Sequence, residues 1–171
     1  MKEGKLHGFQ LWVNMPAKSK MSKPEYLYID ADKIAVHKDE GKLVKVIAGE
    51  YEQAEGPIKG HNVEPIYFDV ELNKDKEFNF NIPSTHNTFI YLIDGEIKIG
   101  TEKHDDIKGS TLILLTKGVN LTVKAKSNAK FLIISGKPIN EEIARGGPFV
   151  MNTKAEILQA VQDYHNGTFV K

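Results

Sequence analysis

The 171-residue chain contains no cysteine, one arginine and one tryptophan, and its formal charge is zero because 23 basic residues balance 23 acidic ones. Without cysteine, the chain has no disulfides, thiolate nucleophiles or Cys-bound zinc and iron–sulfur sites. With Arg145 as the only arginine, bidentate recognition of phosphate or guanine is nearly excluded. A chain with no net charge lacks the positive electrostatic field with which proteins attract nucleic acids and anionic membrane surfaces. We therefore expect no direct nucleic-acid partner and no membrane partner.

Long hydrophobic runs are also absent. The amino-terminal stretch "MKEGKLHGFQLWV" has no apolar segment long enough for a signal peptide, and no later segment approaches the length of a membrane span. We therefore predict a cytoplasmic protein. The length suits one domain, or one and a half.

Alternation of apolar and polar residues dominates from residue 9 to residue 135. The segment "FQLWVN" (9–14) alternates over six residues and is predicted to be a strand, followed by the polar linker "MPAKSKMSKP". Shorter strand candidates are "EYLYI" (25–29), "KIAVHK" (33–38) and "LVKVIAGE" (43–50). Pro65 predicts an edge strand or the first residue of a strand, because proline cannot donate to a ladder.

Three turns predict hairpins. Asp94-Gly95 interrupts "NTFIYLIDGEIKIG" (87–100), where a type I′ turn suits the twist of paired strands. Lys117-Gly118 separates "STLILLT" from "NLTVKA", and a Ser-Asn-Ala turn lies within "KAKSNAKFLIIS". At least eight short strands predict a closed barrel or a two-sheet jelly roll.

The carboxyl-terminal stretch "GGPFVMNTKAEILQAV" changes from a Gly-Pro loop to a helix. Thr153 and Glu156 have the spacing of a capping box, and Asn166-Gly167 supplies a stop, so we predict a helix over residues 153–166. Its apolar stripe consists of Ile157, Leu158, Val161 and Tyr164. A helix of this length is marginal alone in water, so the stripe should dock, and we expect it to cover an open side of the β-structure.

The histidines do not form a metal-binding motif. His7, His37, His61, His86, His104 and His165 are far apart, with no HxH, HxxH or HExxH. The best single candidate is His86, which precedes the 87–100 segment and has Asn81 and Asn87 nearby. One histidine with two asparagines is a poor ligand set.

Other groups of polar residues have simpler interpretations. His104 with Asp105 and Asp106, and the carboxylates Glu50, Glu52 and Glu55, are interpreted as solvated turns. Ser84, Ser110 and Ser135 lack the strand-to-helix elbow of an activated hydroxyl. A barrel mouth lined by Phe78, Phe80, Phe89 and Tyr91 could bind a small apolar ligand, although such residues usually form the core.

Two segments carry a family resemblance. "HGFQLWVNMPAKSKM" (7–21) and "GGPFVMNTKAEILQAVQDYHNG" (146–167) resemble the pirin family of the cupin superfamily, and "TFIYLIDGEIKIG" resembles a cupin core strand pair. The resemblance implies an all-β double-stranded β-helix, the cupin jelly roll, with a short carboxyl-terminal α-helix that packs back on the barrels. It divides the chain into an inter-domain strand and linker (1–23) and a carboxyl-terminal cupin-like domain (24–171).

The resemblance also bears on chemistry. Pirins have two cupin domains, and the first holds iron through three histidines and a glutamate; this chain resembles the part that follows those ligands. The positions that resemble ligand positions of the second cupin are Asn81, Pro83, Asn87, Leu121 and Val123, none of which is a proper ligand. His86 is one residue off register and is expected on the other face. We therefore expect no metal, no cofactor and no catalytic residue.

The leading hypothesis is a metal-free cupin module that binds a partner. The candidate interface is Phe9, Leu11, Trp12 and Val13, and the partner is a separate pirin amino-terminal half or a second copy of the chain. Trp12 could serve as an interface anchor or as a packed core residue. The alternatives are a quercetin-type dioxygenase whose metal comes from a partner chain, as the family implies, and a barrel that binds a small molecule.

Overall fold

The computed structural model describes residues 7–59, 62–100 and 106–170. The chain divides into two compact units: unit 1 combines Met1–Glu25 with Asn140–Lys171, and unit 2 is Tyr26–Ile139. The division differs from the predicted 1–23 and 24–171, because the terminal helix groups with the amino-terminal segment rather than with the strands of unit 2.

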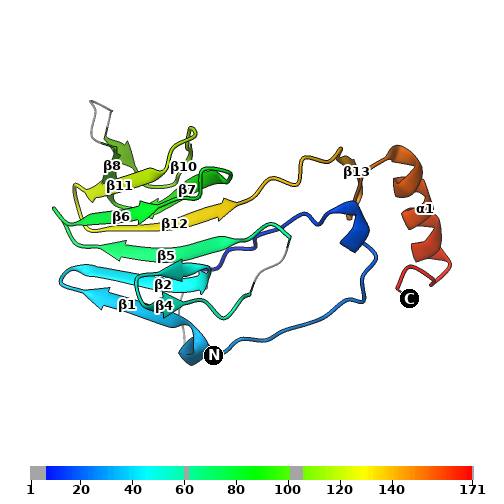
Figure 1. Ribbon diagram of the computed structural model, residues 1–171, viewed down its shortest axis with the longest axis horizontal. Coiled ribbons are helices and arrows are strands. Elements are labelled where there is room, and N and C mark those ends of the chain that lie inside the picture. Colours follow the sequence, from blue (N-terminus) through cyan, green and yellow to red (C-terminus); the bar gives the residue numbers. More distant parts are fainter. Residues whose placement is uncertain (1–6, 60–61, 101–105, 171) are drawn as a thin grey trace. The chain divides into compact units, whose positions relative to one another are not determined.

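Unit 2 consists of two antiparallel sheets (Figure 1). The first has six strands in the order β1-β2-β5-β12-β7-β10, and the second has four in the order β6-β11-β8-β9. The strands of the first are β1 (Ala35–Asp39), β2 (Lys42–Ala48), β5 (Ile66–Leu72), β12 (Ala129–Gly136), β7 (Asn87–Asp94) and β10 (Thr111–Leu114). Those of the second are β6 (Glu77–Asn81), β11 (Asn120–Ala125), β8 (Glu96–Ile99) and β9 (Ile107–Lys108). A small hairpin pairs β3 (Glu50–Tyr51) with β4 (Ala54–Glu55), and a 3₁₀ turn, η2, covers Ala31–Lys33.

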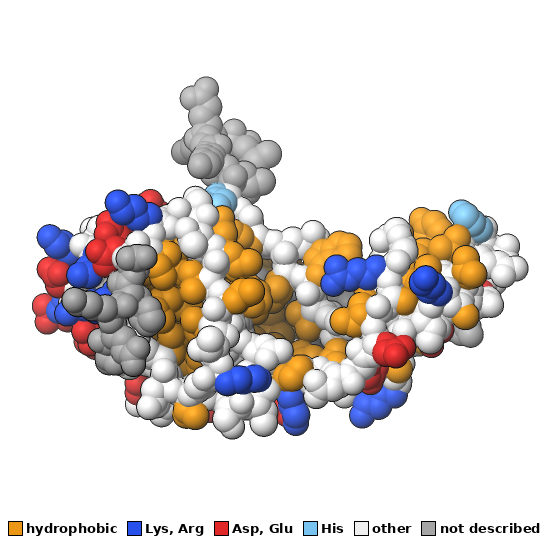
Figure 2. Space-filling view, turned by 90° about the horizontal axis from the view of Figure 1, so that it is seen from above, with side chains coloured by type: hydrophobic (Ala, Val, Ile, Leu, Met, Phe, Trp, Pro, Cys, Tyr) orange, Lys and Arg blue, Asp and Glu red, His pale blue; other side chains and the backbone are white. Residues whose placement is uncertain are grey.

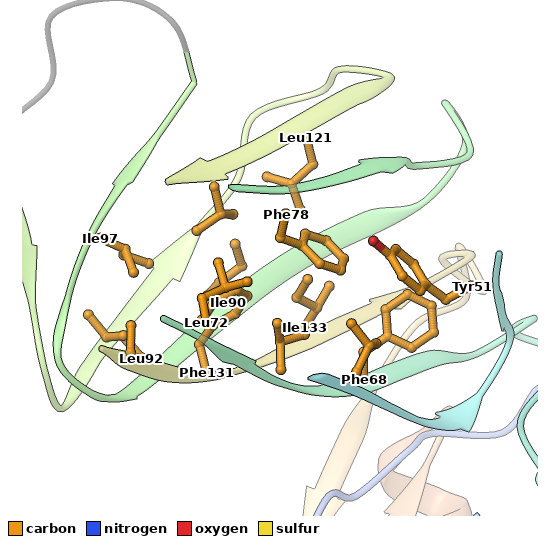
Figure 3. Packing of buried hydrophobic residues seen from close by; sticks show 14 of the residues in the cluster. Tyr51, Phe68, Leu72, Phe78, Ile90, Leu92, Ile97, Leu121, Phe131 and Ile133 are labelled. Atoms are coloured by element: carbon orange, nitrogen blue, oxygen red, sulfur yellow. The ribbon is translucent and has the colours of Figure 1, made fainter. Parts of the chain in front are cut away.

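The hydrophobic core of unit 2 lies between the two sheets. Alternate residues of each strand point inward, so Phe68 on β5, Phe78 on β6 and Phe131 on β12 are fully buried (Figure 3). The Tyr51 ring stacks on Phe78 with 5.0 Å between centroids and meets Phe68 edge-on at 5.8 Å. The period-two pattern that predicted these strands therefore also selects the core.

The architecture is the predicted two-sheet jelly roll and not a closed barrel. Within the described ranges, the outer strands β1 and β10 of the six-stranded sheet pair with no strand of the four-stranded sheet. The two sheets face each other through side chains instead of sharing a continuous ladder. The all-β prediction with one carboxyl-terminal helix is confirmed.

All three predicted hairpins are wrong. The turn at Asp94-Gly95 joins β7 to β8, yet β7 pairs with β10 and β12, whereas β8 pairs with β9 and β11. The same holds for the connections β10 to β11 and β11 to β12, which also pass from one sheet to the other. The turn residues mark a reversal of the chain, but the partner of each strand lies elsewhere in the sequence.

Two further predicted strands do not form. The structure assigns no regular element to residues 9–14 or 25–29, and Tyr26, Leu27 and Tyr28 are at least 73% exposed. Alternation alone does not make a strand where no neighbouring strand offers hydrogen bonds. The candidates at 33–38 and 43–50 become β1 and β2, and β5 begins directly after Pro65.

Unit 1 contains the terminal helix and a short hairpin. Its elements are the 3₁₀ turn η1 (Ala17–Ser19), β13 (Ala144–Gly146), β14 (Phe149–Met151) and α1 (Lys154–His165). The helix packs on the β13–β14 hairpin, where Ala160 is buried and Ile157 lies against Gly146. A Cβ at Gly146 would lie 2.4 Å from Ile157 Cγ2, so this close packing requires a glycine.

The predicted helix bounds agree with α1 and its caps, and the capping box is confirmed. Thr153 Oγ1 accepts from Glu156 N, and Glu156 Oε2 accepts from Thr153 N at 2.7 Å. Two residues of the predicted stripe are exposed, Leu158 at 72% and Tyr164 at 64%, and Ala160 takes the buried position. No helix in the described ranges is long and apolar enough to cross a membrane.

Candidate functional site

A pocket of about 510 Å³ opens in unit 2, beside the β3–β4 hairpin and the start of β5. Its apolar lining comes from Ile58, Pro65, Ile66, Phe80 and Pro83. Its polar lining comes from Glu50, Glu55, Lys59, Glu64, Asn81 and His86. Segments from different strands therefore converge here, as they do at the ends of many β-sandwiches.

His86 is the most enclosed polar group of this pocket. Its side chain is only 2% exposed, and its ring Nδ1 lies 3.3 Å from Ser135 Oγ on β12. Ser135 in turn shares a 2.7 Å hydrogen bond with Thr88 Oγ1 on β7. The other ring nitrogen, Nε2, is buried without a hydrogen-bond partner among the described residues. His86 was expected on the other face from the positions that resemble ligand positions: it is buried where its neighbour Asn87 is exposed, but it lines the same pocket as Asn81 and Pro83.

Glu64 faces His86 from the loop before β5. Its Oε2 lies 3.7 Å from His86 Nε2, and Lys137 Nζ lies 3.3 Å from its Oε1. The hydrogen bond and charge of Lys137 hold the pKa of Glu64 below its ordinary value. Glu64 is therefore a carboxylate at neutral pH, and it presents acceptor oxygens to the pocket.

The positions expected to resemble ligand positions are dispersed. Asn81 and Pro83 line the pocket, but Leu121 and Val123 lie in the hydrophobic core. Asn87 instead accepts a 2.9 Å hydrogen bond from Lys117 Nζ. Within the described ranges, no three histidine, aspartate or glutamate side chains cluster closely enough to hold a metal ion. The groups present at these five positions do not fit a metal ion, because two amides, a proline and two aliphatic side chains stand where a metal-binding cupin has its ligands.

The predicted aromatic mouth is divided between different surroundings. Phe78 is fully buried in the core, and Phe80 alone of the four lines the pocket. Phe89 and Tyr91 alternate with the buried residues Thr88, Ile90 and Leu92 along β7. They therefore lie on the opposite face of the sheet from the core, and the four rings form no common cavity.

Most of the acidic residues singled out in the sequence are exposed, as expected. Glu50, Glu52 and Glu55 are exposed at the β3–β4 hairpin, and Glu55 pairs with Lys59. Asp106 is exposed and lies 4.0 Å from Lys126 Nζ. His104 and Asp105 lie outside the described residues. Sequence reasoning missed the part that Glu64 plays, because its only local clue is a position next to Pro65.

A second hollow lies entirely within unit 1. It is a groove of about 770 Å³ built by the amino-terminal segment, the β13–β14 hairpin and α1. We call it the unit 1 groove; its lining consists of Trp12, Val13, Asn14, Met15, Lys20, Ile143, Arg145, Gly147, Pro148, Phe149, Val150, Met151, Tyr164 and Phe169. In Figure 2, orange hydrophobic side chains reach the surface on the right, in the part of the molecule that carries α1.

The predicted interface residues are all exposed. Phe9, Leu11, Trp12 and Val13 expose 45%, 38%, 69% and 52% of their surface. Trp12 and Val13 line the unit 1 groove, whereas Phe9 and Leu11 precede it in the chain. The alternative of a packed core tryptophan is wrong.

Hydrogen bonds tie together the two segments that form unit 1. Glu141 Oε2 accepts from the backbone N–H of Ala17 at 2.8 Å and from Asn152 Nδ2 at 2.9 Å. Asn152 Nδ2 also donates to the Glu142 carbonyl at 3.0 Å. The amino-terminal segment is thereby held beside β14 and α1, so the groove does not depend on a loose chain end.

The two facing antiparallel sheets and the pocket at their end define a cupin-type jelly roll. The Pirin C-terminal cupin domain model matches residues 67–170, and the chain belongs to the pirin family. It is 37% identical over 169 residues to a pirin-like protein of Caulobacter vibrioides, covering 98% of this chain and 60% of that protein. It is 35% identical over 174 residues to a putative quercetin 2,3-dioxygenase of Vibrio cholerae, covering 99% of this chain and 61% of that protein.

Solved structures agree with this assignment. A crystal structure of quercetin 2,3-dioxygenase from Acinetobacter baumannii matches with a TM-score of 0.83 and 37% identity. The match covers 92% of this chain and 55% of that one. The chain thus spans about 60% of the length of the first two relatives and 55% of this structure.

Proposed function

We propose that this chain acts as the carboxyl-terminal cupin module of a pirin and that its unit 1 groove binds a pirin amino-terminal cupin half. The observation that carries the proposal is the groove, an apolar hollow whose lining includes the largely exposed Trp12, Ile143 and Tyr164. Exposed apolar surface of this kind marks a site of association in soluble proteins.

The relatives indicate the occupant. Roughly 40% of the Caulobacter and Vibrio proteins has no counterpart in this chain, while the match extends over nearly all of the chain, including the segments that build the groove. A pirin amino-terminal half accounts for that remainder. It would bury an indole and several aliphatic side chains, which are common anchors of protein interfaces.

The proposal is tested by mixing the chain with the amino-terminal portion of the Caulobacter pirin-like protein and measuring mass by size exclusion with light scattering. We expect a one-to-one complex, and Trp12→Ala should weaken it by about tenfold or more, since central tryptophans contribute about 2 kcal/mol or more to binding. Tyr26→Ala is the matched control, because Tyr26 is 92% exposed but lies outside the groove.

Two outcomes would contradict the proposal. The first is a monomer that stays unchanged on mixing at micromolar concentration. The second is a homodimer that Trp12→Ala disrupts and the amino-terminal half does not, which would assign the groove to a second copy of the chain.

A second candidate function is quercetin-type dioxygenase activity of the assembled protein. It is favoured by the relatives, since the Vibrio protein and the Acinetobacter structure both have that activity in their names at 35% and 37% identity. In this chain the positions that resemble ligand positions do not fit a metal, so the metal would be held by the amino-terminal half. This chain would then complete and stabilise the enzyme without binding the reacting atoms.

A further inference from the structure

We propose that the pocket of unit 2 binds a small organic ammonium compound, with the ammonium group held between Glu64 and His86 and the organic part against Phe80. The inference concerns unit 2 alone and does not rest on the docking proposed for unit 1. Its starting point is the enclosed Nε2 atom of His86, which lies 3.7 Å from the Glu64 carboxylate and makes no hydrogen bond among the described residues.

The first argument comes from hydrogen bonding at His86. The ring tautomer with its proton on Nδ1 donates to Ser135 Oγ, and Ser135 can then donate to Thr88. In that tautomer Nε2 is an acceptor, buried and without a partner among the described residues. A buried acceptor without a donor costs free energy, which a bound ligand can recover.

The second argument comes from the group opposite. The Glu64 carboxylate, itself an acceptor, lies 3.7 Å from Nε2, which is too long for a hydrogen bond between them. An ammonium group carries several N–H donors and can donate to both atoms at once. A hydrogen bond from a cation to a carboxylate is stronger than one between neutral groups.

The charges around the pocket favour a cation. Glu50, Glu55 and Glu64 line it, whereas Lys59 pairs with Glu55 and Lys137 binds Glu64 from outside the lining. Within the described part of the chain, no lysine or arginine pairs with Glu50. The carboxylates therefore exceed their lysine partners by one.

The aromatic ring at the pocket packs against two other rings. Phe80 meets Phe68 edge-on with 5.1 Å between centroids, and its centroid lies 6.2 Å from that of Tyr51. Phe80 is half-buried, and it lines the pocket beside Ile58 and Ile66. A cation near an aromatic face gains further attraction, and the apolar lining accommodates the organic part.

Three probes of one shape test the proposal: benzylammonium, benzyl alcohol and benzoate, each titrated into the ¹⁵N-labelled full chain and followed by amide chemical shifts. We expect saturable shifts at the amides of residues 64, 66, 80 and 86 with benzylammonium, weaker ones with the alcohol and none with benzoate. Equal binding of the alcohol would show an apolar pocket without charge selection, and preferred binding of benzoate would show an anion site. Either result overturns the proposal, as does the absence of saturable shifts with all three.

Variants locate the bound charge. Glu64→Gln should weaken benzylammonium binding by about fivefold or more, because it replaces a charge-assisted hydrogen bond with a neutral one. His86→Gln should also weaken it, with retained amide dispersion showing that the variant is folded. Glu71→Gln is the matched control, since Glu71 accepts a 2.9 Å hydrogen bond from Lys130 but does not line the pocket. Unchanged binding by Glu64→Gln would refute the assignment.

Discussion

At the scale of single residues, two glycines follow apolar strands but meet different surroundings. Gly95 has a φ of 87°, and a Cβ there would lie 2.3 Å from the Asn128 carbonyl oxygen and 2.7 Å from Ala129 Cα. Gly118 has no heavy atom within 4 Å of its virtual Cβ. The chain passes between the two sheets at both places, but only Gly95 is confined by the backbone of another loop.

Gly95→Ala should therefore destabilise the protein by more than about 2 kcal/mol, because it combines a left-handed backbone with a clash against main-chain atoms. Gly118→Ala should change the free energy of unfolding by no more than about 0.5 kcal/mol, as surface substitutions usually do. Urea unfolding of both variants gives the comparison. Similar free energies for the two would show that the loop at 127–129 can move away at little cost.

At the scale of elements, α1 shows how local chemistry and packing cooperate. Its first turn is closed by Thr153 and Glu156, and its inner side packs on the β13–β14 hairpin through Ile157 and Ala160. Tyr164 extends this side toward Phe149, with 6.0 Å between ring centroids. The cap decides where the helix begins, and the hairpin decides which of its residues are buried.

Thr153→Ala should cost about 1 kcal/mol of helix stability, because the hydroxyl satisfies an otherwise unpaired backbone N–H. Hydrogen exchange of amides 154–165 should become faster, while Thr153→Ser, which keeps the hydroxyl, should exchange nearly as the wild type does. Unchanged exchange in Thr153→Ala would mean that the tertiary contacts of α1 alone hold its first turn.

The same cap predicts a pH dependence. Hydrogen bonds from the Thr153 backbone and side chain hold the pKa of Glu156 below its ordinary value of 4.5, and Asn152 contributes in the same direction. A carboxyl whose pKa is lowered by folding stabilises the folded state above its unfolded pKa, and this stabilisation is lost as pH falls through the folded pKa. Amide exchange in the first turn of α1, corrected for intrinsic rates, should therefore rise below about pH 4. The Glu156→Gln variant should lack that step.

At the scale of the whole molecule, the chain presents two surfaces of different character. Unit 1 has an apolar groove of about 770 Å³, and unit 2 has a pocket of about 510 Å³ with polar groups enclosed in it. The first suits a protein surface and the second a small molecule. Their residues come from separate units, so variants in one surface leave the other as a control.

Metal content separates the two candidate functions at this scale. The purified chain should contain less than about 0.1 equivalent of iron, nickel, copper or zinc by mass spectrometry, since its candidate positions offer no adequate ligand set. The complex with a pirin amino-terminal half should bind about one equivalent, and any quercetin turnover should appear only in the complex. One full equivalent of metal in the chain alone, lost on Asn81→Ala but not on Gly118→Ala, would contradict the ligand argument.

Some features of the fold could be predicted from the sequence alone, because they depend on interactions between residues that are close together in the chain. The capping box, the helix over 153–166, the strands β1, β2 and β5 and the family resemblance depend on residues close together in the chain. Residues 9–14 show the limit, because their alternation resembles that of a strand although the structure has no strand there.

The sequence by itself determined the fold class, the terminal helix and the exclusion of thiol chemistry, because composition and short-range spacing suffice for these. Only the tertiary structure decided which strands pair, since β12 lies between β5 and β7, more than 35 residues earlier in the chain. Only it brought His86 opposite Glu64 and assembled the groove from both ends of the chain. Such contacts join residues that no local pattern connects, so burial and hydrogen bonding across the whole fold select them.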